Sequence, residues 1–319
     1  MNKNLPLMSM FYLISLMGMI SSNNWFMFWI FMEMNSLCFI PLMLIKKTKK
    51  GGEASLLYFI VQGISSMFLL MAMINEESSL MDVSEPNSSL ITVAFLKMGA
   101  GVFFNWLFLL SFSITLSILL LILTLQKLSG FFLLLLSQAG LSYLMLIFIF
   151  LSSFMAMFIN MKQNLFKSML TVSSLSNTSW LLTAVVTTYS GWMFYFAVYS
   201  FSLVLSSTMN NKYLDQNYRN SDTLENPLLF LSMGGLPPMP GFFPKILILM
   251  NLSYSRLSLL SIFLLLAACV DIFIYLRFSF TSALKNNGNL MYCKAVTTKS
   301  IKMLSLSAVT MVTMMAIML

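Results

Sequence analysis

Long apolar runs, separated by short polar segments, dominate this sequence. A helix needs about 20 apolar residues to cross the hydrocarbon core of a membrane. Backbone polar groups cannot be left unpaired in lipid, so every crossing segment should be helical. The pattern predicts about eleven membrane-spanning helices, near residues 5–22, 25–45, 55–75, 89–107, 111–136, 138–159, 164–188, 190–211, 226–252, 256–284 and 300–318.

The loops between these runs differ in charge, which predicts an orientation. One side carries the lysines of three loops, namely Lys46, Lys47, Lys49, Lys50, Lys162, Lys167, Lys285, Lys294 and Lys299. The other side carries an acidic loop with Glu76, Glu77, Asp82 and Glu85. Loops rich in lysine stay on the cytoplasmic or matrix side. We therefore expect the N-terminus there and, with an odd number of spans, the C-terminus on the opposite side.

The composition supports an all-α polytopic membrane protein. Of the 319 residues, 59% are hydrophobic and only 9% are charged, whereas soluble domains carry about 25% charged residues. The net charge of +8 lies largely in short loops, so it indicates topology and no nucleic-acid partner. The chain has no histidine, which excludes histidine-ligated haem, Ser-His and Cys-His catalysis and most zinc sites.

A weak internal repeat divides the predicted single membrane domain, residues 1–319. Residues 1–136 would form a first five-helix repeat and residues 137–284 a second, followed by a C-terminal loop and last helix at 285–319. An odd number of spans in each repeat inverts the second relative to the first, as in many transporters. The fourth helix of each repeat carries a lysine beside helix-breaking glycine and proline residues, which predicts broken helices.

Three lysines and one glutamate stand deep inside long apolar runs: Lys97, Lys127, Lys245 and Glu33. A charge at bilayer depth costs about 2.5–3.5 kcal/mol on insertion scales. Lysines away from water favour their neutral form, so such residues can exchange protons. We therefore predict that these four form a proton relay.

Each member of the predicted relay has a structural alternative. Glu33 is the only acid in the first five apolar runs, so it would pair with Lys97, either in a pair that opens and closes or in a static one. Lys127 has no acid near it in the sequence. Lys127 and Lys245 could also extend their ammonium groups to the membrane surface.

Two further charges, Asp271 and Arg277, share the tenth predicted span. Their spacing of six residues places them on different faces of a helix. Asp271 is a candidate partner for Lys245 or for a neighbouring subunit, and a purely structural role for both residues stays open.

Five segments around these residues resemble the chain 2 family of proton-pumping NADH–ubiquinone oxidoreductase, respiratory complex I. The segments are Trp29 to Asn35, Lys97-Met98-Gly99 with Phe103 and Trp106, Gln126-Lys127, Phe166 to Trp180, and Gly234 to Pro238 with Gly241 to Lys245. The resemblance as a whole covers nearly the entire chain. Where the family usually has proline and histidine, this chain has Val102 and Phe104. Where the family has histidine and glycine before a tryptophan, it has Asn177 and Ser179.

The resemblance implies an antiporter-like, proton-translocating subunit of the membrane arm in the mitochondrial inner membrane. Quinone reduction would take place elsewhere in the complex. This chain would hold no cofactor, and the FMN, the iron–sulfur clusters and ubiquinone are expected in other subunits. Its expected partners are other complex I subunits, especially subunits 4 and 4L, and membrane lipids such as cardiolipin. Two alternatives remain: a non-pumping scaffold subunit and a free-standing cation/proton antiporter.

Overall fold

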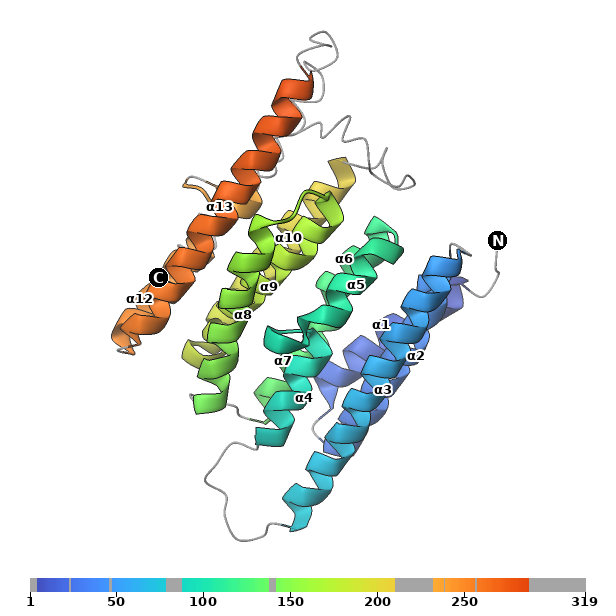
Figure 1. Ribbon diagram of the computed structural model, residues 1–319. Helices are drawn as coiled ribbons and strands as arrows, with labels where there is room; N and C mark the ends of the chain where they lie inside the picture. Colours follow the sequence, from blue (N-terminus) through green and yellow to red (C-terminus); the bar gives the residue numbers. More distant parts are fainter. Residues whose placement is uncertain are drawn as a thin grey trace. The chain divides into compact units, whose positions relative to one another are not determined.

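Helices are the regular elements throughout the part of the chain that the computed structural model describes, residues 5–22, 24–45, 48–78, 88–137, 142–209, 232–237, 239–255 and 257–286. Figure 1 labels the α-helices among them. They are α1 (Leu5–Ser21), α2 (Trp25–Met43), α3 (Lys49–Ser78), α4 (Ser88–Met98), the short 3₁₀ helix η1 (Gly101–Phe104), α5 (Asn105–Ser113), α6 (Leu116–Leu123), α7 (Leu125–Leu136), α8 (Tyr143–Met161), α9 (Phe166–Thr187), α10 (Tyr189–Met209), α12 (Phe242–Tyr254) and α13 (Ser258–Asn286).

Seven helical stretches of the described residues are long and apolar enough to cross a membrane. They are Trp25–Met43, Lys49–Ile74, Ser88–Ser113, Leu116–Leu136, Tyr143–Met161, Phe166–Thr187 and Ser258–Phe280. The predicted all-α, multi-pass membrane class is therefore confirmed. The predicted helix at 300–318 lies outside the described residues, so the count of eleven stays a prediction.

Two predicted helix boundaries are wrong. The helix expected at 55–75 begins at Lys49, because the Thr48 hydroxyl accepts a hydrogen bond of 3.1 Å from the Gly51 backbone N–H and caps the first turn. The turn expected near residues 107–111 lies instead at Ile114 and Thr115, where the backbone is extended. No glycine, proline or charge lies anywhere from residue 107 to residue 115. Hydropathy alone therefore could not locate this turn.

Two spans break at glycines, as the sequence predicts. Helix α4 ends at Met98, and Gly99 and Gly101 follow with φ of 63° and 60°. Gly235, ahead of α12, has φ of 73°. Side chains with a Cβ adopt this left-handed conformation only with strain. These glycines therefore allow the chain to leave a helix within a span.

A third break, at Thr124, was not expected. It separates α6 from α7 inside the run predicted as one helix, 111–136. The Thr124 hydroxyl donates to the Leu120 carbonyl over 2.8 Å. Such a bond to the preceding turn competes with regular helix geometry. The break places Lys127 in the first turn of α7.

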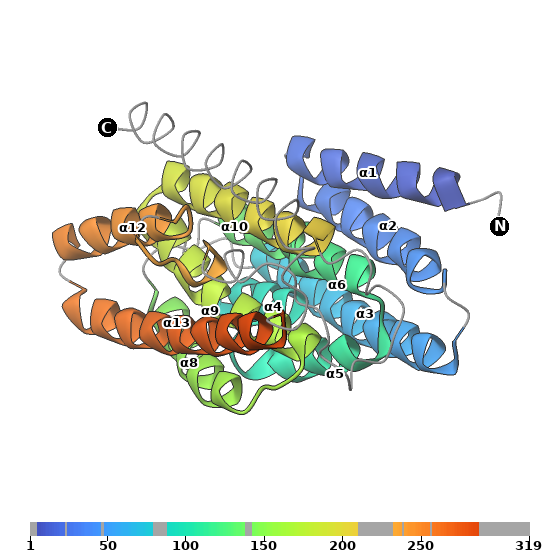
Figure 2. The same ribbon diagram turned by 90° about the horizontal axis from the view of Figure 1, so that it is seen from above.

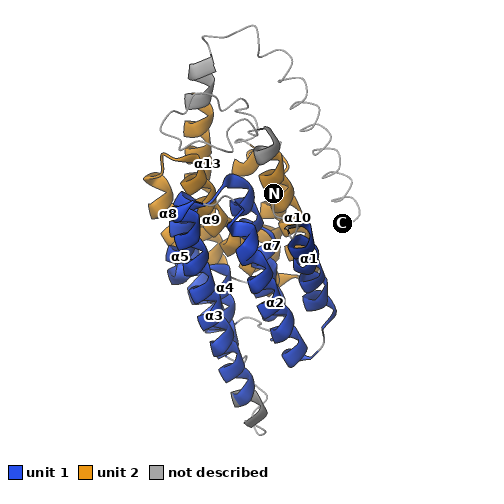
Figure 3. Cartoon of the chain, turned by 90° about the vertical axis from the view of Figure 1, so that its right-hand side faces the viewer, with its two compact units in different colours: residues 1–152 blue, residues 153–319 orange. Residues whose placement is uncertain are grey.

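The chain divides into two compact units, Met1–Ser152 and Ser153–Leu319, coloured separately in Figure 3. The division falls inside α8. The five-helix repeats predicted at 1–136 and 137–284 follow a different criterion, internal similarity, and stay a prediction.

Unit 1 is held together by contacts between helices that are consecutive in the sequence and by contacts between helices further apart. Helix α2 packs on α1 and α3, α3 packs on α4 and α5, and α4 packs on α7, as Figure 2 shows from above for α1 and α2. A row of aromatic rings crosses four of these helices. The distance between ring centroids is 5.7 Å for Tyr12 and Phe39, 5.3 Å for Phe39 and Tyr58, and 6.3 Å for Tyr58 and Trp106. Such pairs contribute about 0.5–1.5 kcal/mol each beyond burial.

Unit 2 is organised around α9, which contacts α10, α12 and α13. Every residue from Ser168 to Ala184 is buried, although many carry hydroxyl groups. These hydroxyls donate to backbone carbonyls three residues earlier, as Ser173 does to Leu170 over 3.0 Å. Their polar atoms are thereby satisfied inside the unit. A polar helix can therefore form the centre of an apolar fold.

We predict that replacing Gly235 by alanine destabilises the protein by about 1–2 kcal/mol, the cost of a left-handed conformation. A Cβ at this position would lie 3.0 Å from the Gly241 carbonyl oxygen. The matched control is Gly63→Ala, in α3, where no atom lies within 4 Å of the new Cβ and helix propensity improves. Thermal unfolding in detergent compares the two variants. Equal unfolding temperatures would contradict the strained conformation at Gly235.

Candidate functional site

The break after α4 releases backbone carbonyls inside unit 1, and two side chains bind them. The Trp106 indole N–H donates to the Leu96 carbonyl over 3.2 Å. The Gln62 amide donates to the Lys97 carbonyl over 3.5 Å. Lys97 itself occupies the last turn of α4, where the negative end of the helix dipole favours a cation. The broken helix thus provides a polar position for Lys97 within the membrane.

Lys97 is buried, with 5% of its surface exposed, and Glu33 on α2 is half-buried. The two described side chains interact electrostatically, and no hydrogen bond joins them. The structure therefore places Glu33 close enough to influence Lys97 without a closed contact. Glu33 also acts electrostatically on the Tyr58 hydroxyl, which is fully buried and has no hydrogen-bond partner among the described residues.

Hydrogen bonds connect the surroundings of Glu33 with α7. The Gln126 amide, on α7, donates to the Asn35 side-chain carbonyl over 3.2 Å, and Asn35 lies two residues after Glu33 on α2. The same amide reaches the Tyr12 hydroxyl, on α1, at 3.5 Å. Polar side chains therefore link the helix that carries Glu33 to the residue that precedes Lys127.

Lys127 is the most deeply buried of the three lysines, with 2% exposure. It lies in the first turn of α7, just after the break, and its backbone N–H donates to the Thr124 carbonyl over 3.1 Å. Its ammonium group does not extend to the surface of unit 1, so the surface-reaching alternative for Lys127 is wrong. Glu33, Lys97 and Lys127 all belong to unit 1, in which α4 packs directly on α7.

Lys245 lies in unit 2, in the first turn of α12, with 7% exposure. Its ammonium donates to the Gly234 carbonyl, freed by the second break, over 3.2 Å. It also lies 5.9 Å from the centre of the Trp180 ring. That distance is at the limit of a cation–π contact, which contributes only about 0.5–1 kcal/mol at weak sites. The alternative in which Lys245 reaches the surface is wrong, because its head group is held at the break.

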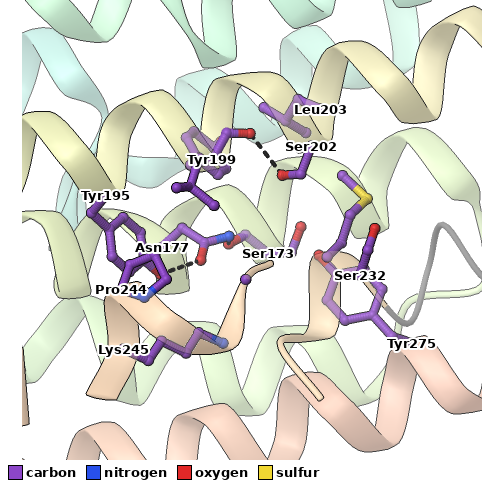
Figure 4. A pocket seen from close by; sticks show the side chains of 13 residues that line it. Ser173, Asn177, Tyr195, Tyr199, Ser202, Leu203, Ser232, Pro244, Lys245 and Tyr275 are labelled. Atoms are coloured by element: carbon purple, nitrogen blue, oxygen red, sulfur yellow. Dashed lines mark hydrogen bonds between the residues drawn. The ribbon is translucent and has the colours of Figure 1, made fainter. Parts of the chain in front are cut away.

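A small cavity opens beside Lys245 (Figure 4). Its volume of about 20 Å³, measured for the centre of a water molecule, exceeds the roughly 10–15 Å³ that one water needs. The Tyr195 hydroxyl donates to the Asn177 side-chain carbonyl in its wall over 2.8 Å. Helices α10 and α12 meet at this wall, where Phe194 and Val198 pack against Phe243 and Leu247. The polar lining residues are Ser173, Asn177, Tyr195, Tyr199, Ser202, Ser232, Lys245 and Tyr275.

Asp271 and Arg277, left open by the sequence, have different surroundings on α13. Arg277 donates to the backbone carbonyls of Met161, over 3.3 Å, and of Gln163. It therefore binds the C-terminal end of α8, which is a structural role. Asp271 is buried and accepts a hydrogen bond of 2.7 Å from the Asn160 amide.

Several polar residues of these sites were not singled out from the sequence. Gln62, Asn160 and Ser176 approach charged residues from distant parts of the chain. The sequence did contain a signal for these residues, because each one is a polar residue inside an apolar run. The sequence could not show which charge each one approaches, because the partners lie on other helices.

Comparison with known proteins gives a consistent result. Residues 22–274 match the family described as NADH:quinone oxidoreductase/Mrp antiporter, TM. NADH-ubiquinone oxidoreductase chain 2 of Scyliorhinus canicula is 31% identical over 281 residues, 82% of this chain and 80% of that protein. The protein of the same name from Artemia franciscana is 31% identical over 274 residues, 83% of this chain and 86% of that one.

Solved structures show the same fold. A chain of respiratory complex I from Thermus thermophilus matches with a TM-score of 0.72 at 18% identity, over 88% of this chain and 70% of that one. A chain of the Mrp complex from Dietzia sp. DQ12-45-1b matches with a TM-score of 0.76 at 13% identity, over 86% and 59%. Taken with the family match and the sequence relatives, the chain belongs to the NADH:quinone oxidoreductase/Mrp antiporter family, in the group of NADH–ubiquinone oxidoreductase chain 2.

Proposed function

We propose that this chain is a proton-translocating subunit in the membrane arm of NADH:ubiquinone oxidoreductase. Glu33, Lys97, Lys127 and Lys245 would exchange the protons. The observation that supports this most strongly is the burial of three lysines inside apolar helices, each one beside a helix break. Two of them, Lys97 and Lys127, lie in stretches long enough to cross a membrane. Buried ionisable residues inside a membrane are costly and commonly mark proton or ion pathways.

The first step involves Glu33 and Lys97. Attraction to the carboxylate holds the proton on the Lys97 ammonium. A change of charge that arrives laterally from a neighbouring subunit would weaken this attraction. The ammonium would then release its proton and become a neutral amine. The phenols and amides between Glu33 and α7, together with water, offer a path to the amine of Lys127, which becomes an ammonium.

The later steps would pass from Lys127 to Lys245 and then to the next subunit. The cavity beside Lys245 supports a route through water and hydroxyl groups, since it is lined by serine and tyrosine side chains. Asn177, at a position where the family usually has histidine, contacts Tyr195 in the wall of this cavity. A chain with no histidine would therefore use water, hydroxyl groups and lysines alone.

The proposal includes the surroundings of the chain. The redox reaction, with FMN, iron–sulfur clusters and ubiquinone, would belong to other subunits, and none of these cofactors would bind here. Subunits 4 and 4L would be neighbours, and cardiolipin an associated lipid, in the mitochondrial inner membrane. Eleven spans, ten of them in two inverted repeats, would place the N-terminus in the matrix and the C-terminus in the intermembrane space. Cation transport by the isolated chain in liposomes would instead support a free-standing antiporter.

We predict that Lys127→Met lowers proton translocation by about tenfold or more without preventing assembly, since a positioned proton donor commonly contributes 10²-fold or more. Protons moved per NADH oxidised are measured in the assembled complex in liposomes. The matched control is Lys162→Met, which removes an exposed lysine at the end of α8. Undiminished pumping by Lys127→Met would support the scaffold alternative.

Lys127→Arg separates proton exchange from a static charge. Arginine keeps the positive charge but does not release its proton in proteins. A relay therefore predicts that this variant assembles and pumps as poorly as Lys127→Met. A scaffold that needs only a buried cation predicts normal pumping, and that result would contradict the relay.

We also predict that Glu33→Gln, which keeps the shape of the side chain but removes its charge, lowers the number of protons moved per NADH. Lys97 would lose the attraction that controls its proton. Glu53→Gln, at an exposed acid near the start of α3, is the matched control and should pump normally. If both variants pump normally, Glu33 does not act as the switch.

A further inference from the structure

Asp271 is a buried acid to which the proposed relay gives no role. It lies in the middle of α13, within the span Ser258–Phe280, and only 4% of its surface is exposed. Removing a carboxylate from water costs several kcal/mol unless a charge or hydrogen bonds compensate it. The surroundings of Asp271 must therefore supply that compensation.

A hydrogen-bond donor fixes the Asp271 carboxyl group. The Asn160 side-chain amide, on α8, donates to it over 2.7 Å. The Ser176 hydroxyl, on α9, lies close by, but it donates to the Ser173 carbonyl over 2.8 Å. An ionised carboxylate only accepts hydrogen bonds, so the Asn160 donor suits the charged form. The amide thus fixes the position of the Asp271 carboxyl group in unit 2.

One positive charge acts on that position. Helix α12, which carries Lys245, packs on α13, and Tyr275, four residues after Asp271 on α13, lines the cavity beside Lys245. Lys245 interacts electrostatically with Asp271 across this contact. The other ionisable neighbours are two phenols, Tyr195 on α10 and Tyr275 on α13, and phenols are neutral at physiological pH. Helices α8 and α9 contribute the uncharged Asn160 and Ser176. Among the described residues, Lys245 is therefore the cation that balances Asp271.

We propose that Asp271 is the counter-ion of Lys245, so that unit 2 has its own carboxylate–lysine pair on α13 and α12. This inference rests on the proposed role of Lys245 as a proton carrier. Asp271 acts as a positioning residue: its charge holds the Lys245 ammonium protonated beside the cavity, and its hydrogen bond from Asn160 fixes where that charge lies. Glu33 and Lys97 have the same relation in unit 1, on α2 and α4.

Two variants at one hydrogen bond separate charge from packing. Asp271→Asn removes the charge but keeps an acceptor for Asn160, whereas Asn160→Ala removes the donor but keeps the charge. We expect Asp271→Asn to lower the number of protons moved per NADH, and Asn160→Ala to lower that number much less. Equal losses in both variants, or no loss in Asp271→Asn, would overturn the counter-ion role.

The pH dependence of Asp271→Asn provides a readout that packing would not move. A buried ammonium without a counter-ion favours its neutral form. The loss of pumping should therefore be largest at alkaline pH and smaller at acidic pH, whereas Asn160→Ala, which keeps the Asp271 carboxylate, should show no added loss at alkaline pH. An Asp271→Asn deficit that does not change with pH would contradict the proposal.

A double variant decides the question if Asp271→Asn does not assemble. Asp271→Asn and Lys245→Met each leave one buried charge without its partner, and the double variant leaves neither. A counter-ion pair predicts that the double variant assembles better than Asp271→Asn alone. Assembly that stays absent in the double variant would overturn the pair.

Parallel measurement of Lys127→Met distinguishes this proposal from the relay. Lost pumping in Lys127→Met with normal pumping in Asp271→Asn would overturn the counter-ion alone. Normal pumping in Lys127→Met would overturn the relay. If the relay is overturned, the charge pair is still tested by the double variant of Asp271→Asn and Lys245→Met. That variant should assemble better than Asp271→Asn alone.

Discussion

Burial of three lysines in apolar helices, two of them within stretches long enough to cross a membrane, is the constraint on which the rest of this structure depends. At about 2.5–3.5 kcal/mol each, their cost is on the order of 10 kcal/mol, comparable to the whole stability of a typical domain. The fold offsets it locally. Lys97 lies at the negative end of α4 and is attracted by Glu33, and Lys245 binds the Gly234 carbonyl and is attracted by Asp271. These arrangements stabilise the lysine ammonium groups, and they also allow an ammonium to release its proton when the attraction weakens.

The helix breaks serve the same requirement. Gly99 and Gly235 let the backbone leave a helix, which frees carbonyl groups that lipid cannot satisfy. Tryptophan, glutamine and lysine side chains bind those carbonyls instead. Each break is therefore a polar site within an apolar span, and charged side chains gather there. A straight helix offers no comparable site, because its carbonyls are already bonded.

The sequence was informative wherever the signal was local. Charged residues in apolar runs marked Lys97, Lys127 and Lys245, and glycine and proline marked two breaks. The break at Thr124 escaped notice because threonine is common in ordinary helices. Contacts between distant helices were also beyond reach. Hydropathy shows which residues share a span, but not that Asn160 meets Asp271, more than a hundred residues later. The choice between partners for Asp271 therefore needed the structure.

A density map of the assembled complex that resolves ordered water tests the central claim most directly. The lysines of unit 1, on the packed helices α4 and α7, should be joined by water and by the side chains of Tyr12, Tyr58 and Gln126. A proton path predicts a continuous set of hydrogen bonds from Lys97 to Lys127 in at least one state of the working enzyme. Dry apolar packing between the two lysines in every state would contradict it.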